Sequence, residues 1–373
     1  MAILTLDHLR RFTVARNFFA PTTLQRALHR MAFVQADPIR APARAQDLIL
    51  RHRVKNYCAG DLERRYAELD VEEDVFVNYG FVTRSLQALM GERGIDEERK
   101  TKKGREPSRT RLLLEFVRER GTVHPREVDE HFSHGTVKNY WGGSSNATTH
   151  LLDAMHYRGL LRVARREKGI RIYTARRNQD RRQAGEDAVV LAPTDAAERR
   201  ARVDALIDVV VRIYAPLPDL SLSFYVRRLR YAAPQWQAEL TGALQRARQR
   251  LSHARIDGSD WYWSKNNAVR GAPRDSVRLL APFDPLVHDR ARFELLWGWG
   301  YRFEAYTPLA KRKLGYYALP LLWCDRVIGW GSLSARNGQL EAEFGYVKSQ
   351  PRDRAFKREL EAELDRMRTF LRV

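Results

Sequence analysis

The 373-residue sequence contains only two cysteines, Cys58 and Cys324, and it lacks several patterns that would place it in a common protein class. The cysteines are far apart and have no zinc or iron–sulfur spacing, so we expect no metal, no other cofactor and a reducing cytoplasm. No run approaches the roughly 20 apolar residues of a membrane span. Residues 1–7 show no basic segment followed by an apolar one, so we expect no secretion signal.

Motifs of several large enzyme classes are also missing. The chain has neither a Gly-x-x-x-x-Gly-Lys phosphate loop nor a Gly-x-Ser-x-Gly nucleophile elbow. His131 and His134 have a spacing that metal ligands use, and Glu72–Asp74 form an acidic run. A polar loop histidine pair and an acidic helix cap or solvated turn are the more ordinary interpretations. These absences argue against nucleotide hydrolases, serine hydrolases and metal-dependent nucleases.

What the chain has in excess is positive charge. Lys and Arg number 66 against 46 Asp and Glu, which gives a formal net charge of +20. Such a field favours a polyanionic partner, and nucleic acid is the commonest one. A membrane-surface protein, or a genome that favours arginine codons, would give a similar composition. Charge alone leaves these alternatives open. By default we expect a monomer in the cytoplasm, associated with the nucleoid if its partner is double-stranded DNA.

One short segment places an amide and a carboxylate together among apolar residues. Gln35 and Asp37 are two residues apart within 33–39, and Pro38 follows. Proline disfavours the helical conformation for the residue before it, so a preceding helix should end here. In an extended segment, residues i and i+2 face the same way. The pair is therefore a candidate for holding and activating a water, although it could equally cap backbone groups.

The order of expected elements repeats along the chain. In residues 1–98, the spacing of apolar residues predicts three helices, the third at 42–53 and rich in arginine. Helix, helix, polar turn, basic helix is the order of a helix-turn-helix module. A basic helix is also an ordinary solvated face. Candidate DNA contacts in this segment are Arg40, Arg44 and Arg51.

The pattern is clearest in residues 107–178, which follow a basic linker. Three helices and then a basic hairpin form the order of a winged helix. The Ser/Asn-rich segment 144–146 precedes the third helix, where backbone N–H groups suit either a cap or a DNA phosphate. The candidate DNA contacts here are Ser144, Ser145, Asn146, Arg165, Arg166 and Lys168.

The rest of the chain adds a third unit and a different ending. Residues 195–277 repeat the helices and end in a hairpin at Asp257-Gly258, a strong turn signal. Aromatic and β-branched residues then predict strands, and a closing amphipathic helix is expected from about 352 to 371. The strands are expected at 297–306, 314–323 and 327–333. The predicted fold is α+β, with three tandem winged-helix units (1–98, 107–178, 195–277) and a small C-terminal β-barrel with the terminal helix (278–373).

Two distant blocks carry a family resemblance. Val34–Arg40, followed by Ala43–Leu50, resembles the bacterial interstrand-crosslink DNA glycosylases, the YcaQ/AlkZ-like group. A second match covers Leu280–Arg290, then Tyr301–Tyr306 and Lys311–Pro320. The resemblance implies the same architecture of winged helices and barrel. It also implies DNA repair by excision of alkylated purines, chiefly N7-alkylguanine, and unhooking of crosslinks built on them.

The resemblance also implies catalytic roles for Gln35 and Asp37, which match the Gln-hydrophobic-Asp form of the family motif. An N7-alkylguanine is already cationic and leaves without a general acid. One carboxylate can then stabilise the oxocarbenium-like sugar and orient or deprotonate water. Because no lysine nucleophile motif is present, we expect a monofunctional enzyme of base excision repair.

A second hypothesis is a non-catalytic winged-helix DNA-binding protein or transcriptional regulator, in which Gln35 and Asp37 are structural. Both hypotheses require DNA contacts, and Lys311 and Arg312 complete the candidate set.

Overall fold

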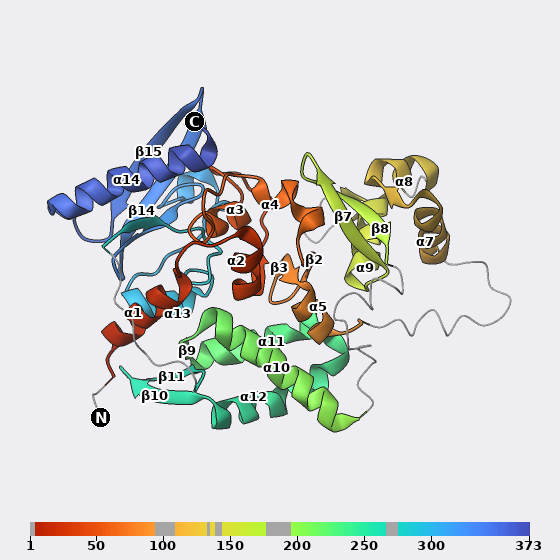
Figure 1. The fold of residues 1–373 in the computed structure, drawn as a ribbon, viewed down its shortest axis with the longest axis horizontal. Coiled ribbons are helices and arrows are strands. Elements are labelled where there is room, and N and C mark those ends of the chain that lie inside the picture. Colours follow the sequence, from red (N-terminus) through yellow and green to blue (C-terminus); the bar gives the residue numbers. More distant parts are fainter. Residues whose placement is uncertain (1–3, 94–108, 133–134, 139–143, 177–194, 266–274) are drawn as a thin grey trace. The chain divides into compact units, whose positions relative to one another are not determined.

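The computed structural model describes residues 4–93, 109–132, 135–138, 144–176, 195–265 and 275–373 (Figure 1). They form a mixed fold of helices and small sheets, as the sequence predicts. The chain divides into two compact units. The first comprises Met1–Leu62, Ile207–Arg227 and Thr241–Val373, and the second comprises Glu63–Leu206 and Arg228–Leu240. In the described ranges, no helix is long and apolar enough to cross a membrane.

The first unit begins with three helices whose ends are set by local sequence. Its amino-terminal elements are α1 (Leu6–Asn17), α2 (Leu24–Met31), β1 (Phe33–Gln35) and α3 (Ala45–Leu50). Thr23 caps α2, because its hydroxyl accepts the backbone N–H of Arg26 at 3.4 Å. The segment after α2 is extended, as Pro38 suggests, although α2 already ends at Met31. The third helix is shorter than the predicted 42–53.

The carboxy-terminal part of this unit holds an antiparallel sheet covered by a helix. The sheet order is β12 (Val277–Leu279), β13 (Leu319–Trp323), β14 (Arg326–Arg336) and β15 (Gln339–Tyr346). Figure 1 shows α14 (Arg354–Leu371) lying along it. Phe356 of α14 packs against the rings of Trp323 and Tyr346, with centroids 5.7 and 6.3 Å away. Within the described residues, β12 and β15 are free edges, so the predicted closed barrel is not confirmed.

The strand predicted at 297–306 is wrong. Residues 290–297 form α13 (Arg290–Trp297), which Asp289 caps at its start and Gly298 ends in the left-handed conformation. Residues 298–306 form no strand. Their aromatic side chains gather on one ring instead of alternating across a sheet, since Trp297, Trp299 and Tyr301 lie 4.8, 5.9 and 5.8 Å from Phe293. The strand predicted at 314–323 is present only as Leu319–Trp323, and 327–333 lies inside β14.

The second unit contains the helices and hairpin predicted for 107–178. Its elements are η1 (Tyr66–Glu68), β2 (Val71–Val75), β3 (Tyr79–Thr83), α5 (Arg84–Met90), α7 (Arg109–Arg120), β4 (Thr122–Val123), α8 (Pro125–Phe132), β5 (Thr136–Lys138), β6 (Ser144–Asn146), α9 (Ala147–Tyr157), β7 (Leu161–Glu167) and β8 (Ile170–Ala175). The order helix, helix, helix, hairpin is confirmed for α7, α8, α9 and β7–β8. The linker predicted at 99–107 lies outside the described residues.

The hairpin predicted at Asp257-Gly258 is also present. It joins β10 (Ser252–Ile256) to β11 (Ser259–Trp263), with φ of 48° and 78° at its two turn residues. β11 also pairs with β9 (Leu217–Pro218). The remaining helices are α4 (Asp61–Arg64), α10 (Ala196–Tyr214), α11 (Asp219–Ala232), η2 (Pro234–Glu239), α12 (Leu240–Arg250) and η3 (Leu309–Lys311).

Candidate active site

Asp37 lies in the first unit, in the loop between β1 and α3, and the loop fixes its carboxylate locally. Pro38 has no N–H, so the first backbone donor after Asp37 is that of Ile39, which donates to Oδ1 at 2.9 Å. The backbone N–H of Asp37 donates to Oε1 of Gln46 on α3 at 3.2 Å. Gln46 is 1% exposed. A buried amide therefore holds the backbone that carries the carboxylate.

The carboxylate of Asp37 is partly buried and has no cationic partner among the described residues. Burial raises its pKa, and the hydrogen bond from Ile39 opposes that shift only in part. A structural carboxylate at this depth ordinarily has an arginine or lysine beside it. A carboxylate with a raised pKa and no ion pair is a candidate for a functional role.

Four aromatic residues of the same unit form what we call the aromatic wall: Phe283, Phe303, Tyr306 and Tyr317. Phe303 is central, with ring centroids 5.2 Å from Phe283, 6.0 Å from Tyr306 and 5.2 Å from Tyr317. Burial of Tyr317 and partial desolvation of the more exposed Tyr306 raise the pKa of both tyrosines, and the negative charge of Asp37 raises it further. The wall therefore lies within electrostatic reach of Asp37.

The two tyrosines of the wall differ in exposure. Tyr306 is 75% exposed, which is unusual for a large aromatic side chain. Tyr317 is 3% exposed, and its hydroxyl has no hydrogen-bond partner within the described part of the chain. A buried hydroxyl without a partner carries a desolvation cost, so such a group calls for an explanation.

The loop that carries Tyr306 is held by side chains instead of a sheet. The buried carboxylate of Glu304 accepts the backbone N–H groups of Lys313 and Leu314 at 2.8 and 2.7 Å. Nε of Arg312 donates to the carbonyl of Thr307 at 2.8 Å. These hydrogen bonds fix the conformation of an irregular loop, and Tyr306 lies in that loop.

Gln35, the other predicted catalytic residue, lies at the end of β1 and is 8% exposed. Its burial and its extended backbone agree with the sequence interpretation of a segment between apolar neighbours. Residues Gln46, Tyr306 and Tyr317 were missed by sequence reasoning. The two tyrosines lie in segments that carried the family resemblance, but only the basic residues there were singled out.

The predicted DNA contacts of the first unit have different environments. Arg40 and Lys311 are exposed, and Arg312 is partly exposed. Arg44 is buried at the start of α3. Arg51 is 4% exposed at its side chain, donates to the buried carboxylate of Glu363 and also donates to the carbonyl of Leu279 at 3.1 Å. Its charge is thus used in holding α14 to β12.

The predicted DNA contacts of the second unit lie on β6 and in the β7–β8 hairpin. Ser144, Ser145 and Asn146 form β6, which pairs with β5 and leads directly into α9. Arg165 and Lys168 are exposed, and Arg165 pairs with Glu167 at 2.6 Å. Arg166 instead donates to both carboxylate oxygens of Glu73, at 2.7 and 2.6 Å.

The acidic run Glu72–Asp74 is not a solvated turn or a helix cap, so that interpretation is wrong. It forms most of strand β2 and is buried. Arg162, Arg166 and Arg93 pair with its three carboxylates. Burial opposes ionisation of Glu73, but the hydrogen bonds and charge of Arg166 outweigh it and lower the pKa. Sequence alone did not show that arginines from distant elements converge on this strand.

Metal ligation has no support in the described part of the chain, where no group of three or more His, Cys, Asp or Glu side chains converges. His131 stacks on Phe116 with centroids 4.6 Å apart, and His134 lies outside the described residues.

Comparison with known proteins places these observations in a family. A family model described as "DNA glycosylase AlkZ-like" matches residues 28–370. The fold is similar to that of DNA glycosylase AlkZ from Streptomyces sahachiroi, with a TM-score of 0.59 and 15% sequence identity. That match covers 99% of this chain and 97% of the other. The chain belongs to the AlkZ-like DNA glycosylase family, and it is a DNA glycosylase.

Proposed function

We propose that this glycosylase hydrolyses the N-glycosidic bond of N7-alkylated purines, including purines within interstrand crosslinks, with Asp37 as its catalytic carboxylate. The observation that carries the proposal is the partly buried carboxylate of Asp37, which no cation neutralises in the described residues and whose charge acts on Tyr306 and Tyr317 of the aromatic wall. A carboxylate in that state can interact with a cationic transition state instead of with a permanent partner.

The reaction needs no cofactor. A water oxygen forms a bond to C1′ of the deoxyribose while the bond from C1′ to N9 breaks. The bonding pair goes to the purine and neutralises the charge that its N7-alkyl group imposed. The proton of the water passes to Asp37 and then to solvent, and ionised Asp37 stabilises the oxocarbenium-like sugar before that transfer. Gln35 orients the water or the nucleotide by hydrogen bonds.

The aromatic wall supplies recognition of a cationic base. Tyr306 offers an exposed π-face, and a positively charged purine is attracted to such a face more strongly than a neutral one. Tyr317 acts as a positioning residue, since its unpartnered hydroxyl can donate to the attacking water or to Asp37 once substrate is bound. Selectivity for alkylated purines then comes from charge as well as from leaving-group ability.

The remaining sequence predictions fit the same proposal. We propose three winged-helix units at 1–98, 107–178 and 195–277 and a C-terminal domain at 278–373, acting as a monomer on chromosomal DNA in the cytoplasm. Of the predicted DNA contacts, we retain Arg40, Arg165, Lys168, Lys311 and Arg312, which are exposed or partly exposed, and Ser144–Asn146 remain candidates on β6. Arg44 is left out because it is buried. Arg51 and Arg166 are left out, because their guanidinium groups serve buried ion pairs.

The test is incubation of the purified protein with a duplex that carries one N7-methylguanine, followed by alkaline cleavage of any abasic site. Asp37→Asn should abolish base release and leave affinity for undamaged duplex nearly unchanged. Asp365→Asn is the matched control, because it makes the same chemical change on an exposed face of α14. A nitrogen-mustard crosslink is tested in parallel. Base release that survives Asp37→Asn, or a wild type inactive on both substrates, would overturn the proposal.

A further inference from the structure

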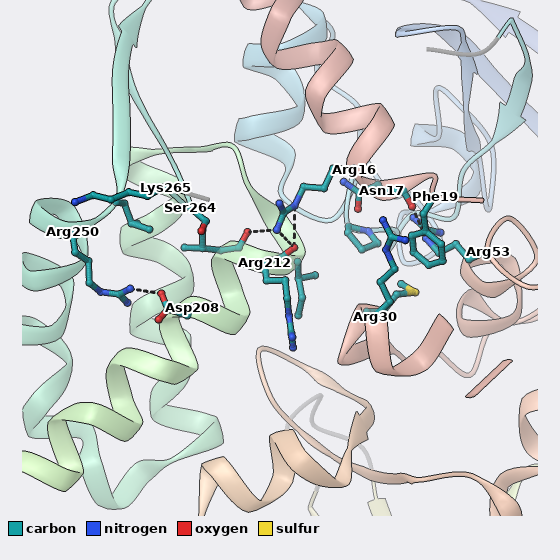
Figure 2. A pocket seen from close by; sticks show the side chains of 15 residues that line it. Arg16, Asn17, Phe19, Arg30, Arg53, Asp208, Arg212, Arg250, Ser264 and Lys265 are labelled. Atoms are coloured by element: carbon teal, nitrogen blue, oxygen red, sulfur yellow. Dashed lines mark hydrogen bonds and ion pairs between the residues drawn. The ribbon is translucent and has the colours of Figure 1, made fainter. Parts of the chain in front are cut away.

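A concave region of the first unit, whose lining residues do not include Asp37, is strongly basic. It has a volume of about 660 Å³ and is lined by residues of α1, α2, α10 and α12 and by the segment after β11 (Figure 2). We call it the basic pocket. Its six basic lining residues are Arg16, Arg30, Arg53, Arg212, Arg250 and Lys265.

Only part of this charge is neutralised by the protein. Arg53 forms an ion pair with Asp284. Arg250 forms an ion pair with Asp208, which Figure 2 shows. Arg16, Arg30, Arg212 and Lys265 form no ion pair with a carboxylate of the described residues. The pocket therefore retains about four uncompensated positive charges.

The uncompensated groups are placed by contacts that do not remove their charge. Nε of Arg16 donates to the carbonyl oxygen of Arg212 at 3.1 Å. The guanidinium of Arg30 lies over the ring of Phe19, 4.1 Å from its centroid. Burial, together with the positive charges of Arg212, Arg292 and Arg30, lowers the pKa of Arg16 to about 10. The side chains repel one another, and a bound anion would relieve that repulsion.

We propose that the basic pocket binds the sugar–phosphate backbone of a DNA strand. Arg30, Arg212 and Lys265 are exposed and can reach successive phosphates. Phe19 and Met31 line the same pocket and contribute a small apolar surface that can contact the deoxyribose between them. A groove that combines spread positive charge with apolar surface is typical of a site that follows a nucleic acid backbone. A single small anion would use only part of it.

This inference rests on the proposed action of the chain on DNA, but it does not depend on Asp37 being the catalytic carboxylate. The test variant is Arg30→Gln with Arg212→Gln, since both side chains are exposed and neither forms an ion pair in the described residues. The control variant is Arg26→Gln with Arg227→Gln, which removes the same charge from two exposed positions outside the pocket. Arg26 is one turn from Arg30 on α2, which makes the comparison stringent.

Binding to an undamaged fluorescent duplex is measured by anisotropy over a range of KCl concentrations. The slope of log K against log salt should be shallower by about 2 in the test variant than in the control variant, because each lost phosphate contact removes about 0.9 from the slope. An equal slope in the two variants would overturn the inference. Circular dichroism establishes that both variants are folded.

Two further measurements separate the possible causes. The first measures the Tm of the wild type and of the test variant with inorganic phosphate. If phosphate raises the Tm of the wild type only, and the slope of log K against log salt is equal in the test and control variants, the pocket binds a small anion and the DNA inference fails. Base release from N7-methylguanine is measured at saturating enzyme. Absence of release in the wild type, with the slope difference intact, would count against the proposed substrate and leave the basic pocket as a DNA site.

Discussion

Arg53 and Asp284, which are 231 residues apart in sequence, form a bidentate ion pair in the interior of the first unit. Nη1 and Nη2 of Arg53 donate to the two carboxylate oxygens at 2.8 and 3.1 Å. Both side chains are at most 1% exposed. Arg53 also donates to the carbonyls of Asn17 and Ile49, at 3.1 and 2.7 Å. The pair links the amino-terminal helices to the segment that precedes α13.

The ion pair predicts a large stability effect. Asp284→Ala leaves the guanidinium of Arg53 buried without a counter-charge, which typically costs about 3–5 kcal/mol in the free energy of unfolding. Urea unfolding followed by circular dichroism measures it. Asp365→Ala breaks an exposed pair with Arg368 and should cost under about 0.5 kcal/mol. Equal losses in the two variants would mean that the buried pair has no special role.

The raised pKa of Asp37 predicts how base release depends on pH. Only the ionised carboxylate can stabilise the sugar cation and accept a proton. Because burial raises the pKa above the ordinary value of 3.8, activity should be lost as pH falls through this higher pKa. Single-turnover rates of base release between about pH 3 and pH 8 give the apparent pKa. An inflection below 3.8, or none attributable to the enzyme, would contradict the assignment.

The same carboxylate predicts a gain in stability when it is neutralised. A raised pKa means that the folded state binds the proton of Asp37 more tightly than the unfolded state does. Ionisation of Asp37 therefore lowers the free energy of unfolding as pH rises through its folded pKa. At pH 7, Asp37→Asn should have a higher Tm than the wild type, whereas at acidic pH the difference should narrow. A lower Tm at pH 7 would show that the carboxylate is structural.

Tyr317→Phe should separate stability from catalysis. It removes a buried hydroxyl that has no partner, so stability should rise by about 1 kcal/mol. If that hydroxyl donates a hydrogen bond in the transition state, the single-turnover rate should fall about tenfold. The Kd for damaged duplex should change little. A faster or unchanged rate in a stabilised variant would remove Tyr317 from the mechanism.

Tyr306→Ala tests recognition of base charge. Loss of the exposed π-face should weaken binding of duplex with N7-methylguanine by about 0.5–2 kcal/mol, and binding of undamaged duplex much less. Tyr306→Phe retains the face and should behave like the wild type. The comparison is made by competition anisotropy. An equal loss for damaged and undamaged duplex would indicate a general DNA contact.

Local sequence signals predicted much of the fold. The helices α7, α9 and α14 and the hairpins β7–β8 and β10–β11 lie where apolar spacing and turn residues place them. The segment 297–306 did not follow its composition, because aromatic residues favour strands only when a partner strand is available. Here Phe293 of α13 provides a helical surface for them. Strand β15 was not predicted, since its alternation includes two charged residues, Glu341 and Glu343, on an exposed edge.

The candidate site was predicted from sequence only where its residues are close together in the chain. Gln35 and Asp37 were selected because two polar residues in an apolar segment need a reason to be there, and their catalytic role stays a prediction. Tyr317 had no such signal, since a buried tyrosine in an aromatic-rich region is usually core. Charge likewise selected Arg51 and Arg166 as DNA contacts, but their carboxylate partners come from elements far along the chain. Long-range pairing is what sequence patterns of this kind do not encode.

The Arg53–Asp284 pair also has a consequence for synthesis in the cell. Asp37 and Arg53 precede Asp284 and the residues of the aromatic wall by more than 200 residues in the chain. The second unit, Glu63–Leu206 and Arg228–Leu240, is synthesised between them. The proposed site at Asp37 can therefore be completed only after the segment that carries Asp284 has been synthesised, and the ion pair with Arg53 then joins that segment to the amino-terminal helices.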